Sequence, residues 1–329
     1  MASSDAPLLE VSQLRIKLPT PQGLVTIVDG VDLVIEAGKV YGIAGESGSG
    51  KTITALSLLR LLPQGAVVEG RAMLGSRDLL ALGRSDLRSV RGREVAMVFQ
   101  DPMTSMHPMI PVGRQLTDHL RAHLRTSRAN ARRRAIELLT DVRIPDPEGA
   151  LRSFPHQFSG GMRQRIAIAI ALACEPKLLL ADEPTTALDV TVQAGIIRLL
   201  DRLRRETGVA ILLITHDLGV MSSIAEWVSV FYAGRVVESG RTADIIGDPR
   251  HPYTRGLLGS LPAFGTDAEA VPQLRPIAGQ PPSPADRPAG CPFHTRCDYA
   301  EDRCTKQLPE LLQMTGGRGL ACLVDPGAA

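Results

Sequence analysis

The segment at residues 45–52 constrains the fold of this chain more than any other feature. Its sequence, GESGSGKT, matches the pattern G-x-x-x-x-G-K-[ST] without a mismatch. The glycines let backbone N–H groups converge on phosphate oxygens because no Cβ stands in the way. The lysine adds positive charge at the β- and γ-phosphates, and the threonine hydroxyl can ligate Mg²⁺. The candidate phosphate-binding residues are Gly45, Ser47, Gly48, Ser49, Gly50, Lys51 and Thr52.

The flanking residues place this loop between a strand and a helix. Residues 40–44 form an apolar run that predicts a buried strand, and residues 52–62 have helical apolar spacing that stops at Pro63. The alternative is a glycine-rich turn without function, which would require neither a strand before it nor a helix after it. The context therefore favours a phosphate-binding loop.

Polar residues follow several apolar segments that predict buried strands. Such strands are expected over residues 95–99, 178–181 and 209–214, with helical patterns between them. This alternation is typical of a parallel sheet covered on both faces, and the C-terminal ends of such strands carry ligand sites. The residues at these strand ends are Gln100, Asp182, Glu183 and His216.

Two adjacent acids at a strand end indicate hydrolytic chemistry. Asp182 is placed to hold the Mg²⁺ shell, and Glu183 is placed to take a proton from an attacking water. The alternatives are a solvated turn for the acids and a core or capping role for His216, and Gln100 alone indicates little. A phosphate-binding loop in the same chain favours the catalytic interpretation.

The segment Ser159-Gly160-Gly161 predicts a second anion-binding position. Ser159 is a suitable N-cap for the apolar helix expected after it, and free N–H groups at a helix start attract anions. An ordinary helix cap is the alternative. Two phosphate-binding helix starts in one chain suggest that ATP lies between two chains, each of which contributes one of these segments.

Composition narrows the function classes. The 329 residues carry a net charge of +2 and only 3% aromatic residues, which argues against nucleic acid as a partner. The arginines 128, 132, 133 and 134 are interpreted as a solvated helix face rather than a nucleic-acid site. No apolar run reaches the length of a membrane helix, and residues 1–5 lack the features of a secretory signal, so a cytosolic protein is expected.

The residue pattern and composition differ between regions of the chain, which indicates how it is organised. Residues 8–44 alternate apolar and polar positions, which predicts antiparallel strands with turns at residues 19–23 and at Gly30. Residues 113–144 have helical spacing. From about residue 249 the chain is rich in proline and contains four of its five cysteines. We expect a core up to about residue 248, followed by a C-terminal extension.

The cysteines of this extension lack the C-x2-C spacing of common zinc sites. Their spacing leaves an iron–sulfur centre, zinc and free thiols as alternatives in a cytosolic chain. Cys174 lies in an apolar helical segment and is expected to be a core residue. The four cysteines concerned are Cys291, Cys297, Cys304 and Cys322.

These motifs, taken in order, resemble those of ATP-binding cassette (ABC) proteins, and most of all the ATPase subunits of oligopeptide/dipeptide importers. The similarity extends over nearly the whole chain. It rests on the phosphate loop, on residues 99–105, 158–165, 178–183 and 187–189, on His216, on His251-Pro252-Tyr253-Thr254 and on residues 290–297. The resemblance implies an α/β fold with a RecA-like parallel sheet, an antiparallel N-terminal sheet and a helical subdomain at about residues 101–175. It implies domains at residues 1–248 and 249–329.

The resemblance also implies roles and partners. Glu183 would be the general base, Gln100 would link Mg²⁺, water and the permease, and His216 would hold the γ-phosphate. Mg²⁺ would be held by Thr52, Gln100 and Asp182, and the four cysteines of the extension would hold a [4Fe-4S] cluster. Ser159 and Gly161 would clasp ATP bound to the partner chain, with Asp189 at the dimer seam.

The implied partners are a paralogous ATPase, two membrane permease subunits and an extracytoplasmic substrate-binding protein. The chain would be peripheral, at the cytoplasmic face of the cell membrane. The alternatives are another cargo, such as nickel, glutathione, an opine or an oligosaccharide, a soluble ABC ATPase of DNA repair or translation, and an iron–sulfur regulator that only binds nucleotide.

Two departures from the family pattern stand out. Residues 1–40 contain no Phe, Tyr or Trp to stack on adenine, so Leu18 or Val25 is expected to provide an aliphatic platform instead. Residues 106–108 read Met-His-Pro where the family usually has Leu-Asn-Pro. This segment lies near the expected permease contact, and its sequence suggests an adjusted fit to the partner.

Overall fold

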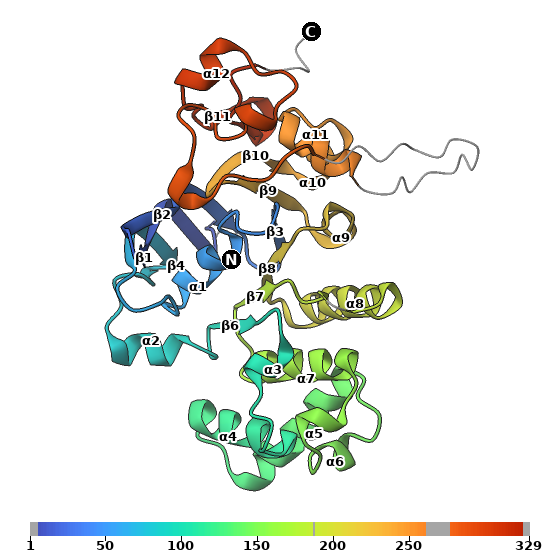
Figure 1. The fold of residues 1–329 in the computed structure, drawn as a ribbon. Helices are drawn as coiled ribbons and strands as arrows, with labels where there is room; N and C mark the ends of the chain where they lie inside the picture. Colours follow the sequence, from blue (N-terminus) through green and yellow to red (C-terminus); the bar gives the residue numbers. More distant parts are fainter. Residues whose placement is uncertain (1–5, 187, 261–276, 325–329) are drawn as a thin grey trace, which may run out of the picture. The chain divides into compact units, whose positions relative to one another are not determined.

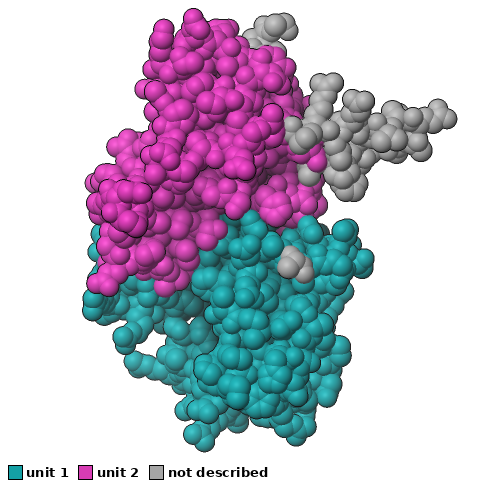
Figure 2. All heavy atoms as spheres, viewed as in Figure 1, with its two compact units in different colours: residues 1–10, 34–40, 73–214 teal, residues 11–33, 41–72, 215–329 magenta. Residues whose placement is uncertain are grey.

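The computed structural model describes residues 6–186, 188–260 and 277–324. The chain forms two compact units (Figures 1 and 2). Unit 1 comprises residues 1–10, 34–40 and 73–214, and unit 2 comprises residues 11–33, 41–72 and 215–329. Each unit is assembled from segments that are far apart in the sequence.

The sheet of unit 1 is parallel. Strands β6 (Val95–Val98), β7 (Leu178–Asp182) and β8 (Ala210–Thr215) lie side by side, with Val95 opposite Leu178 and Leu178 opposite Ala210. Every residue of β7 and β8 is buried. Strands buried on both faces read as continuous apolar runs, which is why the sequence predicts all three.

Helices make up most of the rest of unit 1, and Figure 1 shows α4 to α7 gathered together. The helical spacing of residues 113–144 is divided between two helices, because Arg125 adopts a left-handed φ of 50° and Ser127 caps the second helix. The helices are α2 (Arg84–Val90), α3 (Pro102–Ser105), α4 (Val112–Leu124), α5 (Arg128–Asp141), α6 (Pro147–Ala150), the 3₁₀ turn η1 (Pro155–Gln157), α7 (Gly160–Leu172) and α8 (Val190–Thr207).

The N-terminal strands of unit 2 are longer than expected. Strand β1 (Leu9–Thr20) is followed after two residues by β2 (Gly23–Ile35), and β4 (Val67–Leu74) lies on the other side of β1. The predicted turn at Gly30 is wrong, because β2 continues through this glycine with a φ of 67°. A glycine accepts this conformation inside a strand without a Cβ clash. The end of β4 pairs with β5 (Arg77–Asp78) within unit 1.

The strand before the phosphate loop does not belong to the sheet of β1, β2 and β4. Strand β3 (Val40–Ala44) pairs in parallel with β9 (Trp227–Tyr232), which pairs antiparallel with β10 (Arg235–Arg241). Helix α1 (Lys51–Leu58) ends before the predicted Leu62, because Arg60 has a left-handed φ of 51°. Two short helices, α9 (Leu218–Ile224) and α10 (Thr242–Gly247), complete this part.

The C-terminal extension joins the same sheet through β12, which pairs antiparallel with β10 so that Leu320 faces Glu238. Its elements are α11 (Pro252–Gly259), the 3₁₀ turns η2 (Pro284–Asp286), η3 (His294–Arg296) and η4 (Thr315–Gly317), α12 (Asp302–Lys306), β11 (Leu312–Gln313) and β12 (Gly319–Leu320). Among the described residues, no helix has both the length and the apolar character needed to span a membrane.

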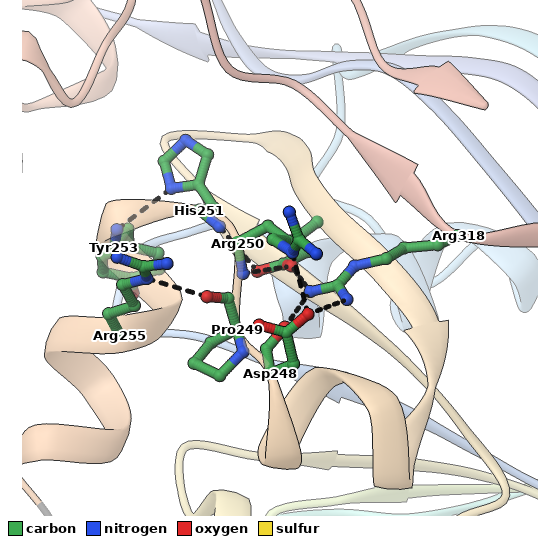
Figure 3. A network of polar contacts seen from close by, with 8 residues as sticks. Asp248, Pro249, Arg250, His251, Tyr253, Arg255 and Arg318 are labelled. Atoms are coloured by element: carbon green, nitrogen blue, oxygen red, sulfur yellow. Dashed lines mark hydrogen bonds and ion pairs between the residues drawn. The ribbon is translucent and has the colours of Figure 1, made fainter. Parts of the chain in front are cut away.

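A buried carboxylate anchors the extension to β10. Glu238 is fully buried and accepts hydrogen bonds from the backbone N–H groups of Arg250, at 2.8 Å, and His251, at 3.1 Å. It also forms an ion pair with Arg318, which reaches Asp248 as well (Figure 3). Because a buried charge requires partners, Glu238 fixes the start of the extension and its last strand together.

Candidate nucleotide-binding residues and cysteine pocket

The sequence-predicted nucleotide site is divided between the two units. The phosphate loop and His216 belong to unit 2, whereas Gln100, Asp182, Glu183 and the segment 159–161 belong to unit 1. Within unit 1 the structure brings Gln100 and Glu183 into contact. Within unit 2 it brings the phosphate loop against residues of β9 and of the C-terminal extension.

The phosphate loop has a backbone that only glycines adopt easily. Gly45, Gly48 and Gly50 have φ values of 146°, 77° and 100°, respectively. A Cβ on Gly45 would lie 2.3 Å from the carbonyl oxygen of Phe231 on β9. The glycine positions of the motif are therefore explained by a positive φ and, at Gly45, by close contact with the neighbouring strand.

Two polar side chains of the loop, those of Ser49 and Lys51, are buried. The buried Lys51 donates from Nζ to the carbonyl oxygens of Gly45, at 2.7 Å, and Glu46, at 2.8 Å. The Ser49 hydroxyl is buried and has no hydrogen-bond partner within the described residues. Buried polar atoms without a partner mark places where a ligand supplies one. A lysine held over a glycine-rich loop, with this hydroxyl beside it, fits a bound phosphate chain.

The acids lie at the C-terminal end of β7. Asp182, the buried last residue of this strand, faces Ile214 of β8. Glu183 turns away from the strand with a φ of 43°, and its carboxylate Oε2 accepts hydrogen bonds from Gln100 Nε2, at 3.2 Å, and Thr186 Oγ1, at 2.7 Å. Sequence reasoning missed Thr186. The available signal was a hydroxyl three residues after an acid, in the turn that follows a strand.

Helix α7 begins as the sequence predicts. The exposed Ser159 caps it by accepting a hydrogen bond from the backbone N–H of Met162, at 3.3 Å. Gly161 has a packing role that the sequence did not reveal, since a Cβ there would lie 2.6 Å from Cγ1 of Val192 on α8. A Cβ on Gly160 would make only an ordinary contact, at 3.5 Å from Leu188.

The remaining candidates lie at element ends or on strand faces. His216 is exposed and directly follows β8, and Asp217 after it caps α9. The exposed Asp189 caps α8 by accepting from the N–H of Val192, at 2.9 Å. The possible adenine platforms, Leu18 on β1 and Val25 on β2, are half-buried. Arg128, Arg132 and Arg133 of α5 are exposed, as expected of a solvated helix face.

The four cysteines of the extension line one pocket, together with His251 and Phe293. Burial is the main influence on the pKa values of Cys291 and Cys297, and the nearby backbone N–H groups of Phe293 and Tyr299 act against it. Burial raises the pKa values of Cys291 and Cys297, and it raises the pKa of Cys322 to about 11. These thiols are therefore protonated at neutral pH unless a metal replaces the proton. Cys174 is buried separately in unit 1.

The pocket offers thiols that lie near one another without converging on one point. Within the described ranges, no three His, Cys, Asp or Glu side chains are close enough to hold a single metal ion. A cubane cluster binds each thiolate through a different iron, so its ligands do not need to share one point. Four sulfurs lie around one pocket, and two of them have backbone N–H groups nearby, which is the ligand chemistry that such a group uses.

A buried histidine connects this pocket to helix α11. His251 caps the helix by accepting at Nδ1 from the N–H of Tyr253, at 3.0 Å, and Arg255 donates to the carbonyl of Pro249, at 2.8 Å (Figure 3). Burial lowers the pKa of His251 to about 3. A neutral ring is required for the acceptor role, so the low pKa and the helix cap agree.

A glycine-rich loop between a strand and a helix, with two acids at the end of a buried strand, defines the class of phosphate-loop nucleotide-binding proteins. Residues 28–186 match the family model for ABC transporters, and residues 237–304 match that for the C-terminal region of oligopeptide/dipeptide transporters. The chain belongs to the family of oligopeptide/dipeptide ABC transporter ATP-binding proteins.

Full-length relatives agree with this assignment. The chain is 47% identical to a peptide import ATP-binding protein of Brucella abortus, covering 96% of this chain and 95% of the relative. It is 46% identical to the oligopeptide transport ATP-binding protein OppD of Salmonella typhimurium, with 96% and 93% covered. Identity to the dipeptide transport ATP-binding protein DppD of Bacillus subtilis is 45%, with 92% and 90% covered.

Solved structures show the same cassette fold. A dimeric ATP-binding cassette in a post-hydrolysis state, bound to ADP and Pi, is similar with a TM-score of 0.64 at 27% identity, covering 71% of this chain and 98% of that one. The cbiO1 protein of Clostridium perfringens, part of an ABC transporter complex, gives 0.63 at 26% identity, with 74% and 92% covered. The fold is therefore an ABC ATPase cassette with mixed α/β sheets.

Proposed function

We propose that this chain hydrolyses ATP to power the import of oligopeptides or dipeptides through a membrane permease. The observation that carries this function is the match over 96% of the chain to peptide import ATP-binding proteins, which includes both the cassette and the C-terminal region. The conformation of the phosphate loop supports the ATPase activity, because its glycine backbone and inward-facing Lys51 suit a triphosphate.

The residue roles follow from the family and from the local geometry. The backbone of residues 45–52 and Lys51 bind the phosphates. Thr52, Asp182 and Gln100 would hold Mg²⁺, which would neutralise charge that develops on the phosphates. His216 contacts the γ-phosphate. Ser159, Gly160 and Gly161 contact ATP bound by the facing chain, with Asp189 at the dimer seam.

Glu183 acts as the general base. Its carboxylate accepts the proton of the attacking water, and Gln100 and Thr186 orient the carboxylate by donating to its Oε2 atom. A water aligned with the γ-phosphate then displaces ADP, so that phosphate and ADP are the products. ATP closes two cassettes face to face, hydrolysis reopens them, and the permease moves between its inward and outward states.

The partners in this scheme are a paralogous ATPase, two permease subunits and an extracytoplasmic substrate-binding protein. The chain is peripheral, at the cytoplasmic face of the membrane, and its cassette extends to residue 248. Residues 101–110 are the proposed permease contact. Gln115 braces this segment by accepting from the N–H of His107 and donating to its carbonyl, and Met109 is left 73% exposed.

Reconstitution tests the function. The chain is combined in proteoliposomes with the permease and substrate-binding subunits that co-purify from its native membrane, and uptake of a labelled peptide mixture is measured with and without ATP. ATP-dependent peptide uptake supports the proposal. Uptake of nickel, glutathione or an opine, but not of peptides, would show that this compound is the cargo. Purification without membrane subunits would favour a soluble ABC ATPase.

We further propose that Cys291, Cys297, Cys304 and Cys322 hold a [4Fe-4S] cluster that orders the extension. The support is the shared pocket and the backbone N–H groups near two of the sulfurs. Iron and acid-labile sulfide are measured in protein purified without oxygen. Four irons and four sulfides per chain are expected, and they should be lost in Cys297→Ser but not in Cys174→Ser. Zinc or metal-free thiols in the anaerobic protein would contradict this proposal.

A further inference from the structure

An arginine of the C-terminal extension makes a two-point contact with the phosphate loop of its own chain. The two terminal nitrogens of Arg296 donate to the two carboxylate oxygens of Glu46, at 2.7 Å and 3.0 Å. The Arg296 side chain is only 4% exposed, and that of Glu46 is 26% exposed. A bidentate arginine–carboxylate pair of this kind is stronger and geometrically more specific than a surface ion pair.

The guanidinium is held in place from several sides. Its Nε donates to the carbonyl of Ala278, at 2.9 Å, and a terminal nitrogen donates to the Tyr232 hydroxyl, at 3.3 Å. Its central carbon lies 5.8 Å from the ring centre of Tyr232 and 5.9 Å from that of Phe293. Rotation of Arg296 away from Glu46 would break all of these contacts, so the pair is preorganised.

The backbone of Glu46 is fixed as well as its side chain. The hydroxyl of Tyr253 on α11 accepts a hydrogen bond from the N–H of Glu46, at 2.8 Å, while Lys51 donates to its carbonyl, at 2.8 Å. Tyr253 is fully buried, and its ring packs against Tyr232 and Phe293 with centroids 4.6 Å and 5.4 Å apart. The extension therefore holds the second residue of the loop at both its N–H and its carboxylate.

A carboxylate within a phosphate-binding loop carries an electrostatic cost, because it repels the triphosphate in a partly buried setting. We propose that the C-terminal extension completes the phosphate loop in cis, with Arg296 neutralising Glu46 and Tyr253 fixing its backbone, so that these two positioning residues set nucleotide affinity. This inference rests on the proposed function, because it requires that residues 45–52 bind the triphosphate.

A double-mutant cycle tests the pair. The affinity for a non-hydrolysable ATP analogue is measured by calorimetry on the full chain for wild type, Arg296→Met, Glu46→Gln and the double variant. Arg296→Met should weaken binding about tenfold, because the unpaired carboxylate then faces the triphosphate. Glu46→Gln alone should bind at least as tightly as wild type. The double variant should return to within about threefold of wild type, since neither charge remains.

Matched variants separate positioning from damage to the fold. Arg303→Met removes an arginine of the same extension that pairs with Glu301 at the surface, and it should leave affinity unchanged. Tyr253→Phe should weaken binding less than Arg296→Met, because it removes one neutral hydrogen bond. If Arg296→Met fails to fold, Arg296→Gln serves in its place, since it also removes the charge and should weaken binding in the same way, while its amide keeps a hydrogen-bond donor. In steady-state assays KM should rise while kcat changes little.

Two outcomes would overturn the inference. One is an Arg296→Met chain that binds the analogue as tightly as wild type. The other is a double variant that binds as weakly as Arg296→Met, because general damage is not rescued by a second substitution. A wild-type chain that binds no nucleotide would instead refute the proposed function, so the two failures are distinguishable.

Discussion

The side-chain amide of Gln100, just beyond β6, donates to the carboxylate of Glu183, just beyond β7, across 3.2 Å. Thr186 donates to the same oxygen from the turn after Glu183, at 2.7 Å. Two donors from different segments therefore fix the direction of one carboxylate. In the proposed mechanism this preorganisation leaves the base little reorganisation to perform when water attacks.

Glu183→Gln should reduce ATP hydrolysis by about 10² to 10⁴-fold, because an amide cannot accept the proton from the attacking water. Nucleotide binding should be retained, since the phosphate loop is unchanged. Phosphate release and nucleotide affinity are measured on the same preparation. Thr186→Val is the matched control, because it removes only one hydrogen bond to the carboxylate and should cost about tenfold. Wild-type turnover in Glu183→Gln would remove this residue from its assigned role.

Ser159→Arg should lower hydrolysis by about a hundredfold while its own chain still binds nucleotide, because the proposed contact is with ATP held by the facing chain. The change also removes a helix cap, worth about 1 kcal/mol. Ser127→Arg provides the control, since Ser127 is an exposed serine that caps α5 in the same unit, at 3.2 Å from Asn130 N. Equal losses of activity in both variants would mean that Ser159 acts only as a helix cap and does not contact ATP on the facing chain.

Gly161→Ala should destabilise the chain by about 1–3 kcal/mol, because the new methyl group would meet Val192 at 2.6 Å. Val192→Ala in the same chain makes room, so the double variant should recover the melting temperature. Hydrolysis by the double variant then separates two roles. Recovered activity means that Gly161 serves packing, whereas a folded but inactive chain means that its backbone must approach the nucleotide.

His119 should make stability fall in mild acid. Burial, followed by the nearby His123, lowers the pKa of His119 to about 4, and its Nε2 makes no hydrogen bond within the described residues. As the pH falls, the imidazole of His119 binds a proton near pH 6.5 in the unfolded chain, but only near pH 4 in the folded chain. The contribution of the neutral His119 to the free energy of unfolding is therefore complete above pH 6.5 and is lost towards pH 4. The loss should be about 1–3 kcal/mol in the free energy of unfolding.

Urea unfolding between pH 7 and pH 4 measures this effect. His119→Gln should flatten the pH profile, and His156→Gln, which changes an exposed histidine, should not. A profile as steep in His119→Gln as in wild type would assign the acid sensitivity to other groups.

Much of the fold was predictable because its signals are local. The short apolar runs at β3, β6, β7 and β8 require burial on both faces. Few structures other than a strand in the middle of a sheet satisfy this requirement, so these strands could be predicted. The phosphate loop was found from its glycines, three of which, Gly45, Gly48 and Gly50, have positive φ values in the structure. Ser159 was found as a cap because its hydroxyl serves the helix that directly follows it.

What the sequence did not reveal depends on distant partners or on single backbone angles. Arg296 and Glu46 are separated by 250 positions, and no local pattern pairs them. Gly161 was predicted to contact ATP bound to the partner chain. In the structure, the side chain of Val192 on another helix leaves no room for a Cβ at this position. The turn expected at Gly30 was wrong because a glycine within a long strand resembles a glycine at a strand end.

The pairing of β12 with β10 has a practical consequence for anyone who wishes to shorten this protein. Removing the residues after 248 would take β12 away from one edge of β10 and leave Glu238 without Arg318 and the N–H groups of residues 250 and 251. An unpaired edge strand next to a buried carboxylate without partners favours the addition of a strand from another molecule, and therefore aggregation. The trimmed cassette should precipitate rather than behave as a minimal ATPase.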